Sequence, residues 1–309
     1  MKKLSGTTHP LPGEQAGRLL IMDASGEVIF QNFPVDVPVP VHSAAKPIQS
    51  LPFFLLHLDE VYDLSDREKA ILSSSHLGQS QHMEVLSALL EKTSIREDDL
   101  LLPKMPPAGH LAKENWRRAN LPSRKLYHPC AGNHIALLLA QRELTGQAAG
   151  YADPSSRVQQ EVRRLMAAFA ECDADTIGTM TDGCGIPGFR LTLRELANVY
   201  RHLACGASSF SDAGISPAVV RNIAAMKKQP LMLEGDGCLS SIVSAAPGLL
   251  GKTGMNYLFA VGHIQQHYSI VVQSVDRQWS SVAALLEEGL LRMMYSNSEV
   301  LTQIQALSQ

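Results

Sequence analysis

The sequence predicts an α+β fold, in which one antiparallel sheet is assembled from both ends of the chain and helices fill the middle. Two observations carry this prediction. Short strand-like runs occur near residues 17–33 and again beyond about 250, whereas residues of about 44–228 show mostly helical spacing. We therefore expect a single domain over residues 1–309, with the sheet supplied by about 17–33 and 250–300 and a helical insert between them.

The first strands are expected to form a hairpin. Residues 18–23 and 28–32 are short apolar-rich runs, and the four residues between them, Ala-Ser-Gly-Glu, have the composition of a turn. Two antiparallel strands therefore open the fold.

The middle of the chain carries apolar residues at three-to-four spacing, which is typical of helices with one buried face. The Pro/Gly-rich stretch 102–109 is expected to be a loop inside the domain. The expected helices cover residues 51–56, 66–72, 83–92, 134–145, 158–169, 191–203 and 217–227.

Strand character returns near the end of the chain. Residues 256–261 and 268–274 flank a turn at 262–267 and are expected to form a second antiparallel pair, followed by an apolar-striped helix at 282–294. Large side chains of this last helical region can serve either the core or a subunit contact, and we expect a homodimer. These side chains are Trp279, Met293, Met294 and Tyr295.

Composition and charge narrow the class of protein. The chain is 45% hydrophobic and 18% charged, as in ordinary globular proteins, and its net charge is −3. Lysine and arginine never occur in a run longer than two, so the clustered cations that a nucleic-acid partner requires are missing. A small neutral or zwitterionic ligand is the more natural partner.

The amino-acid sequence also shows no pattern typical of a membrane span or an export signal. No segment has about 18 uninterrupted apolar residues, and the lysines near the N-terminus are not followed by an apolar stretch. The five cysteines are odd in number, scattered and without a Cys-x-x-Cys pair, which fits reduced thiols. We expect a cytoplasmic protein with no membrane partner.

The stretch Ser43-Ala-Ala-Lys46 and the later triplet Lys252-Thr253-Gly254 are the most informative motifs. Helical spacing places residues three apart on one face, so the Lys46 amine can take the proton of the Ser43 hydroxyl if the site keeps that amine neutral. One Ser-x-x-Lys is expected by chance in about every such chain, but Lys-Thr-Gly is much rarer. Their ordered occurrence predicts a Ser-Lys acyl-transfer site, with the triplet on or just before a strand.

Two further stretches can carry polar groups to this site. The run from Ser73 to Gly78 is expected to be a loop between helices, and either it is a solvated turn or Ser75 or His76 passes a proton to a leaving amine. The run from Thr181 to Pro187 is rich in glycine. It is either a tight turn with a buried thiol at Cys184, or a ligand-binding loop in which Asp182 receives an ammonium group.

Cys130, His134 and Cys184 have the side chains that zinc prefers. Their sequence spacing is not that of a compact zinc motif, and isolated cysteines and histidines are usually structural. Zinc binding is therefore one alternative, and three structural residues are the other.

The ordered motifs resemble the asparaginase II family of the Rhizobium-etli type, over about residues 18–294. The resemblance rests on five stretches: Ser43-Ala-Ala-Lys46-Pro-Ile-Gln, Ser75-His76-Leu-Gly with His82 beyond it, Cys130-Ala-Gly-Asn-His134, Asp182-Gly-Cys-Gly-Ile-Pro, and Lys252-Thr-Gly254. It implies a fold similar to that of serine β-lactamases and penicillin-binding proteins. It also implies hydrolysis of L-asparagine to L-aspartate and ammonia.

The resemblance implies a role for each matching residue. Ser43 would be the nucleophile, Lys46 its base, and Ser75 with Lys252 a second hydroxyl–amine pair. Cys130, Cys184 and Asp182 would form a substrate-side site that can hold zinc, although no cofactor is required. We expect the substrate to be an amino-acid amide, contacted by His42, His76, His134, Asp182, Thr253 and Gly254.

The chain departs from the family pattern at three positions. The family usually has Arg where this chain has His42, Glu where it has Gln79, and a zinc-ligating Lys where it has Asn133. An amide at Asn133 is a weak ligand for zinc, so a weakened zinc site is expected.

Three hypotheses of function follow. The first is an asparaginase-like amidohydrolase that forms an acyl-enzyme on Ser43. The second is a Ser-Lys hydrolase of another small amide, such as glutamine, a β-aspartyl compound or a β-lactam-like ring. The third is a relative that binds an amino acid without turnover, motivated by the changes at His42, Gln79 and Asn133.

Overall fold

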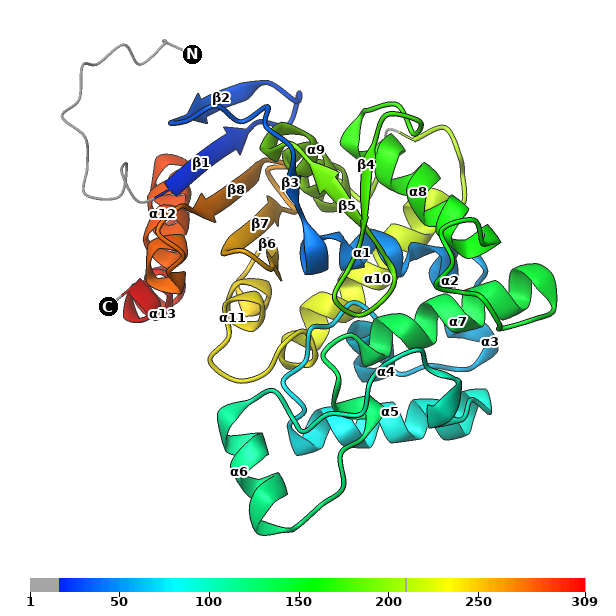
Figure 1. Cartoon of the computed structure of the whole chain (residues 1–309). Helices are drawn as coiled ribbons and strands as arrows, with labels where there is room; N and C mark the ends of the chain where they lie inside the picture. Colours follow the sequence, from blue (N-terminus) through cyan, green and yellow to red (C-terminus); the bar gives the residue numbers. More distant parts are fainter. Residues whose placement is uncertain (1–16, 209, 309) are drawn as a thin grey trace.

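The computed structural model describes residues 17–208 and 210–308. The N-terminal lysines, which the prediction of no export signal concerns, lie outside the described residues. At its centre is a five-stranded antiparallel sheet with the strand order β2-β1-β8-β7-β6 (Figure 1). The two ends of the chain meet where β1 pairs with β8. The strands are β1 (Gly17–Met22), β2 (Val28–Gln31), β6 (Leu249–Gly254), β7 (Leu258–His263) and β8 (Ser269–Ser274).

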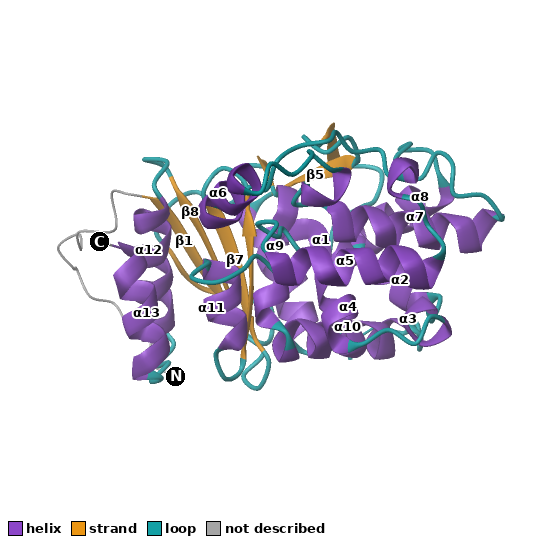
Figure 2. Cartoon of the chain, turned by 90° about the horizontal axis from the view of Figure 1, so that it is seen from below, coloured by secondary structure: helices purple, strands orange, loops and turns teal. Residues whose placement is uncertain are grey.

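Both faces of this sheet are apolar and covered by helices. Alternation along β1 sends Leu19 and Ile21 into one hydrophobic cluster and Leu20 and Met22 into another. Seen edge-on in Figure 2, the sheet separates a small group of helices from the larger helical region. The small group consists of α11 (Leu239–Ala245), α12 (Trp279–Arg292) and α13 (Ser298–Ser308).

On the opposite face, α9 (Leu193–Ala204) packs against β1, β7 and β8. The approach is close at Gly262, where a Cβ atom would lie 2.5 Å from the carbonyl oxygen of Tyr200. A side chain there would force α9 away from the sheet.

The remaining helices form the large region on the α9 side of the sheet (Figures 1 and 2). They are α1 (Lys46–Gln49), α2 (Leu51–Leu55), α3 (Leu58–Val61), α4 (Asp66–Ile71), α5 (Ser80–Thr93), α6 (His110–Arg118), α7 (Ala131–Thr145), α8 (Arg157–Ala170) and α10 (Ile215–Lys228). Among them α7 is buried along most of its length, from Ala131 to Gln141, and provides the floor of this region.

The described chain also contains a second, three-stranded sheet with the strand order β3-β5-β4. Its strands are β3 (Val39–Pro40), β4 (Gly178–Thr181) and β5 (Pro187–Leu191), all antiparallel. Because β3 leads directly to Ser43 and the β4–β5 turn contains Asp182, this small sheet brings two distant motifs together.

The predicted fold class is confirmed, since one antiparallel sheet is built from both chain ends around a helical insert. All seven expected helices of the middle region are present, and the 102–109 stretch is a loop. Helices α6 and α13 were missed because their sequences are polar or short of apolar periodicity, and α11 because it spans only two turns.

Two details of the C-terminal prediction are wrong. The strand expected at 256–261 begins at Leu258, because Asn256 and Tyr257 both have positive φ and form the turn between β6 and β7. The sheet expected to continue to about residue 300 ends at Ser274, after which the described chain is helical. Within residues 17–208 and 210–308, no helix combines the length and apolarity needed to cross a bilayer.

Candidate active site

Ser43 lies on a short 3₁₀ helix, His42–Ala45, which continues into α1 at Lys46. The α-helix expected for the Ser-x-x-Lys motif is therefore replaced by a 3₁₀ turn at its start, in which side chains three apart are eclipsed. The backbone enters this turn through His42, whose φ of 45° is unusual for a residue with a side chain. The start of the 3₁₀ helix is held in place by the amide of Val41, which donates to the carbonyl of Phe189 in β5 at 3.0 Å.

Two lysines meet at the hydroxyl of Ser75. The Nζ atoms of Lys46 and Lys252 each lie 3.0 Å from Ser75 Oγ, and Lys46 Nζ also donates to the carbonyl of Ser74 at 2.5 Å. Both lysines are buried, with exposed fractions of 2% and 0%. Three residues from separate motifs, Lys46, Ser75 and Lys252, are thus brought together, and Ser43 precedes Lys46 by three residues.

Ser43 itself is partly exposed, whereas the residues that follow it are buried. Within the described chain, no hydrogen bond joins its hydroxyl to Lys46, whose amine is directed to Ser74 and Ser75. Ser43 is therefore partly accessible to an incoming molecule, whereas both lysines are buried.

Burial changes the acid–base behaviour of Lys252. Removal from water lowers the pKa of this amine, Glu234 and Cys130 raise it, and positive charge at Lys46 lowers it; together these effects bring the pKa to about 8. An amine with this pKa is mostly protonated at neutral pH and loses its charge in mildly alkaline solution.

Glu234 and Ser240 are site residues that the sequence reasoning missed. Glu234 Oε1 lies 3.6 Å from Lys252 Nζ and accepts a hydrogen bond from the Thr253 hydroxyl. Ser240 Oγ accepts from the Thr253 amide at 2.9 Å. The only sequence signal was an acid in a Gly-rich stretch, Glu234-Gly-Asp236-Gly, and it does not distinguish the two acids.

Thr253 and Gly254 were expected to contact substrate. In the structure Thr253 is tied to Glu234, Ser240 and Lys252. Gly254 lies against the 3₁₀ turn, where a Cβ atom would be 2.6 Å from the carbonyl oxygen of Val41. The Lys-Thr-Gly triplet therefore places the edge strand β6 directly beside Ser43, and its glycine permits that approach.

His42 and Asp182 are joined at 3.0 Å between Nδ1 and Oδ1, and His42 Nε2 lies 3.2 Å from the side-chain amide of Asn256. Burial raises the pKa of Asp182, but hydrogen bonds from His42 and from the Gly183 amide outweigh it and hold this pKa below its usual value. Asp182 is therefore an anion beside Ser43. Asn256 was not predicted, because it reaches the site only through the β6–β7 turn.

His76 and His134 are fully buried and neutral. His76 Nδ1 accepts from the Gly78 amide at 3.1 Å, and desolvation lowers its pKa well below the usual value. His134 Nδ1 is bonded to the Tyr151 hydroxyl at 2.8 Å, and burial lowers its pKa to about 3. Neither ring is exposed, so a contact between these histidines and a substrate remains a prediction.

Cys130 and Cys184 are brought together, as the zinc alternative requires. A hydrogen bond with Cys184 lowers the pKa of Cys130, and the same contact with burial raises the pKa of Cys184. Asn133 is fully buried with its Oδ1 atom unpartnered among the described residues, and its Nδ2 atom faces the Leu72 carbonyl at 3.4 Å.

This set of donors does not fit a structural zinc site. Such a site takes four N or S ligands in a tetrahedron. In the described part of the chain, no group of three or more His, Cys, Asp or Glu side chains is placed to hold a metal ion. Two thiols with a neutral amide form an incomplete set, and zinc binding remains a prediction.

A buried network of hydrogen bonds connects the segments that carry Lys46 and Ser75. Asn222 of α10 donates to the carbonyl of Pro47 at 3.0 Å and to Ser50 Oγ at 3.2 Å, and it accepts from Ser73 Oγ at 3.2 Å. The hydroxyls of Ser50 and Ser73 are themselves 2.7 Å apart. This network fixes α1, which carries Lys46, against the loop that carries Ser75.

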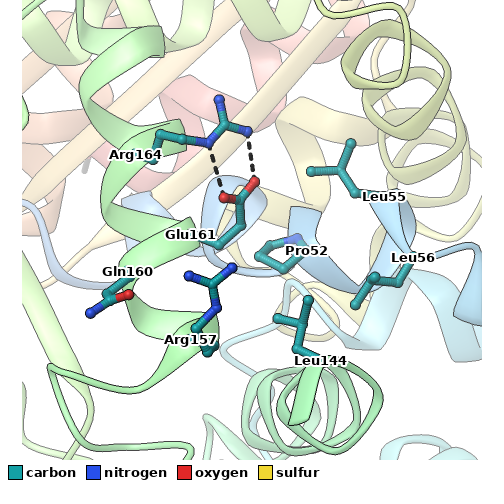
Figure 3. A pocket seen from close by; sticks show the side chains of 8 residues that line it. All are labelled: Pro52, Leu55, Leu56, Leu144, Arg157, Gln160, Glu161 and Arg164. Atoms are coloured by element: carbon teal, nitrogen blue, oxygen red, sulfur yellow. Dashed lines mark hydrogen bonds and ion pairs between the residues drawn. The ribbon is translucent and has the colours of Figure 1, made fainter.

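Two surface pockets lie away from the lysines. A pocket of about 340 Å³ between α2, α7 and α8 has apolar walls and a rim where Glu161 and Arg164 pair (Figure 3). A larger one of about 730 Å³ lies between α5 and α6, and Gly78 and Gln79 line it on the far side of the Ser75 loop. Neither pocket is lined by a residue of the predicted catalytic set.

The solved structures that are similar to the chain include three at 12% identity. One is a candidate beta-lactamase from Bacteroides dorei DSM 17855, with a TM-score of 0.45 and coverage of 84% of this chain and 85% of that one. Another is Mglu in its native form, with a TM-score of 0.48 and coverage of 96% and 65%. The third is EstCE1, a hydrolase with promiscuous acyltransferase activity, with a TM-score of 0.40 and coverage of 96% and 94%.

Comparison with curated proteins finds no match. A family model, in contrast, covers nearly the whole chain, including Ser43, Ser75, Lys252 and the two cysteines that the fold brings together. With this match over residues 13–309, the chain belongs to the L-asparaginase II family.

Proposed function

We propose that this chain hydrolyses the side-chain amide of L-asparagine through an acyl-enzyme on Ser43. Membership of the L-asparaginase II family supports an amidohydrolase. The observation that carries the proposed mechanism is the placement of Ser75 Oγ at 3.0 Å from both lysine amines, one of which, Lys46, follows Ser43 by three residues.

In the proposed first half-reaction, Ser43 Oγ attacks the amide carbon and its proton goes to the amine of Lys46. That proton then passes through the Ser75 hydroxyl to the departing nitrogen, which leaves as ammonia and breaks the C–N bond. The Lys252 cation, buried beside Ser75, favours the negative charge that develops on the substrate. Water then cleaves the ester and returns Ser43 to its free form.

Substrate recognition is assigned to the groups at the mouth of the site. The Asp182 carboxylate suits the α-ammonium group of an amino acid, and His42 with Asn256 fixes that carboxylate in place. His42 stands where the family usually has arginine, so the second candidate is hydrolysis of a different small amide by the same chemistry.

Ammonia release from the purified protein tests this proposal. The panel would contain asparagine, glutamine, a β-aspartyl dipeptide and a β-lactam, the last followed by ring opening. We expect asparagine to have the highest kcat/KM and the Lys46→Met variant to lose turnover, because that change keeps the stem and removes the amine. Faster turnover of another amide would replace asparagine as substrate, and tight binding of asparagine without ammonia release would indicate a non-catalytic relative.

A further inference from the structure

The positions of the two lysines at Ser75 do not show which of the two amines carries a proton. Each amine is 3.0 Å from the same hydroxyl, and both are almost completely buried. Two ammonium groups this close in a poorly solvated site repel each other, so one proton is shared between the two positions. The Ser75 hydroxyl can accept from one amine and donate to the other in either sense.

Glu234 distinguishes the two lysines. Its carboxylate lies 3.6 Å from Lys252, and in the described part of the chain it forms no ion pair with Lys46. Two hydrogen bonds hold the carboxylate, from the Thr253 hydroxyl to Oε1 and from the Ser240 amide to Oε2 at 3.2 Å. Only 9% of Glu234 is exposed, so water screens this charge little.

The backbone around Glu234 is joined to the Ser75 loop. The Ser75 amide donates to the carbonyl of Leu233 at 2.7 Å, and the Leu77 amide donates to the carbonyl of Glu234 at 2.9 Å. The carboxylate, the hydroxyl and the Lys252 strand therefore keep fixed positions relative to one another.

We propose that Glu234 is the positioning residue that holds the shared proton on Lys252 and so leaves Lys46 as the neutral amine that accepts the proton of Ser43. In this arrangement Lys252 and Lys46 both donate to Ser75 Oγ, and Lys46 also donates to the Ser74 carbonyl. The single lone pair of the neutral Lys46 amine is then left to accept the proton of Ser43. The inference rests on the proposed function only for the identity of the reaction, and the assignment of the proton stands on the ion pair.

Three charged groups act on the pKa of Lys252: Glu234, Lys46 and Cys130. Lys46 opposes a proton on Lys252, while Glu234 and Cys130 favour it, and Glu234 is the only one of these that forms an ion pair with it among the described residues. Cys238 lies near Glu234 and Lys252, but burial and Glu234 raise its pKa to about 11, so it remains a neutral thiol near pH 7. The carboxylate is thus the group whose removal should change the proton distribution most.

The test is Glu234→Gln, which keeps the shape and removes the charge. An opposite charge at this distance is worth roughly 1 to 3 pKa units, so the alkaline limb of the kcat/KM profile should move to lower pH by at least about one unit. At pH 7.5 a shift of one unit from a pKa of about 8 corresponds to a loss of about threefold, and a shift of two units to a loss of roughly twentyfold. Glu234→Asp, which retains the charge, should restore part of the shift.

The matched control is Glu68→Gln. Glu68 is also buried and pairs with a lysine, Lys92, at 3.0 Å, but it lies at the start of α4. Its loss should lower the melting temperature and leave the pH profile in place. An alkaline limb that stays at the wild-type pH in folded Glu234→Gln would overturn the inference.

A titration independent of turnover separates this inference from the proposed function. Carbon-13 NMR of the lysine Cε atoms in the wild-type protein, assigned with Lys46→Arg and Lys252→Arg, reports the charge of each amine. We expect Lys252 charged and Lys46 neutral at pH 7, even if no amide in the panel is hydrolysed. A charge on Lys46 and none on Lys252 would overturn the assignment, whether or not the variants of Glu234 fold.

Discussion

At the scale of single residues, the site depends on conformations that a sequence pattern does not reveal. His42 adopts a positive φ immediately before the candidate nucleophile, and both of its ring nitrogens have partners, in Asp182 and Asn256. A strained residue of this kind persists only when its surroundings hold it, and such residues cluster at functional sites. Here it turns the chain so that Ser43 faces outward while Lys46 is buried.

Ser43→Ala tests the nucleophile. The hydroxyl is partly exposed, so its removal should leave the melting temperature unchanged while amide hydrolysis falls at least about 10³-fold. Ser74→Ala is the control, because Ser74 Oγ has no hydrogen-bond partner in the described structure and its carbonyl, which receives Lys46, is kept. Comparable activity in Ser43→Ala would remove the nucleophile assignment.

The pKa of Lys252 predicts how activity depends on pH. Its cation is the active form and its pKa is lowered to about 8, so activity should be retained below this value and fall as the pH rises through it. An unperturbed lysine would keep its charge to about pH 10. Measuring kcat/KM between neutrality and pH 10 checks this, and a profile flat across that range would exclude Lys252 as the essential cation.

Zinc content is predicted to be below one per chain. Cys130 and Cys184 supply two thiols, but the buried amide of Asn133 is a poor third ligand. Elemental analysis of protein purified without chelator measures the content. About one tightly held zinc per chain, lost in both Cys130→Ser and Cys184→Ser, would contradict the weak site.

At the scale of elements, the catalytic distances are set by contacts between helices rather than within them. Lys46 is at the start of α1 and Ser75 follows α4, and the hydrogen bonds of Asn222 on α10 connect these segments. From the other side, Lys227 of α10 donates to carbonyls of Ser244 and Leu249, which fastens β6 to the same helix. Helix α10 is therefore the common support of both lysines.

Asn222→Leu tests this support. The change removes three hydrogen bonds, those of Asn222 with the Pro47 carbonyl and with the hydroxyls of Ser50 and Ser73, and it should cost about 2 kcal/mol in the free energy of unfolding. We also expect a lower kcat, because α1 and the Ser75 loop lose their link. Urea unfolding measures the first effect, with the exposed Asn115→Leu of α6 as control. A loss no larger than in the control would show that the network is dispensable.

At the scale of the whole molecule, the exposed apolar side chains of the last helices are relevant to whether the chain forms a homodimer. Met293 and Tyr295 pack against the cluster beneath α12, which is the core alternative for these side chains. Trp279, Leu291 and Met294, in contrast, are 43%, 53% and 87% exposed. The homodimer expected from the sequence stays a prediction, and substitution of these exposed apolar side chains can test it.

Sedimentation velocity of the wild type should give the mass of a dimer. Leu291→Glu places a charge on the exposed face of α12 and should shift the protein toward the monomer. Leu111→Glu is the control, since Leu111 is 65% exposed on α6, far along the chain. A monomeric wild type would exclude the homodimer, and an equal effect of both variants would exclude α12 as the contact.

The sequence by itself determined the class of fold and the residues that we propose for catalysis. Period-two and helical spacing predicted the order of the elements, because these periods follow from local backbone geometry. The ordered motifs containing Ser43, Ser75 and Lys252 predicted the family, because chemistry requires particular side chains whatever their distance along the chain. The boundaries near Asn256 were missed, since a tight turn overrode the apolar pattern.

Only the tertiary structure decided which groups surround those residues. Glu234, Asn256 and Asn222 reach the site from a loop, a hairpin turn and a distant helix, and none of them stands at a recognisable spacing from its partners. The charge of Lys252 likewise depends on burial and on a carboxylate eighteen positions before it in the chain. Electrostatic effects act through space and through the local dielectric, and the folded structure alone defines both.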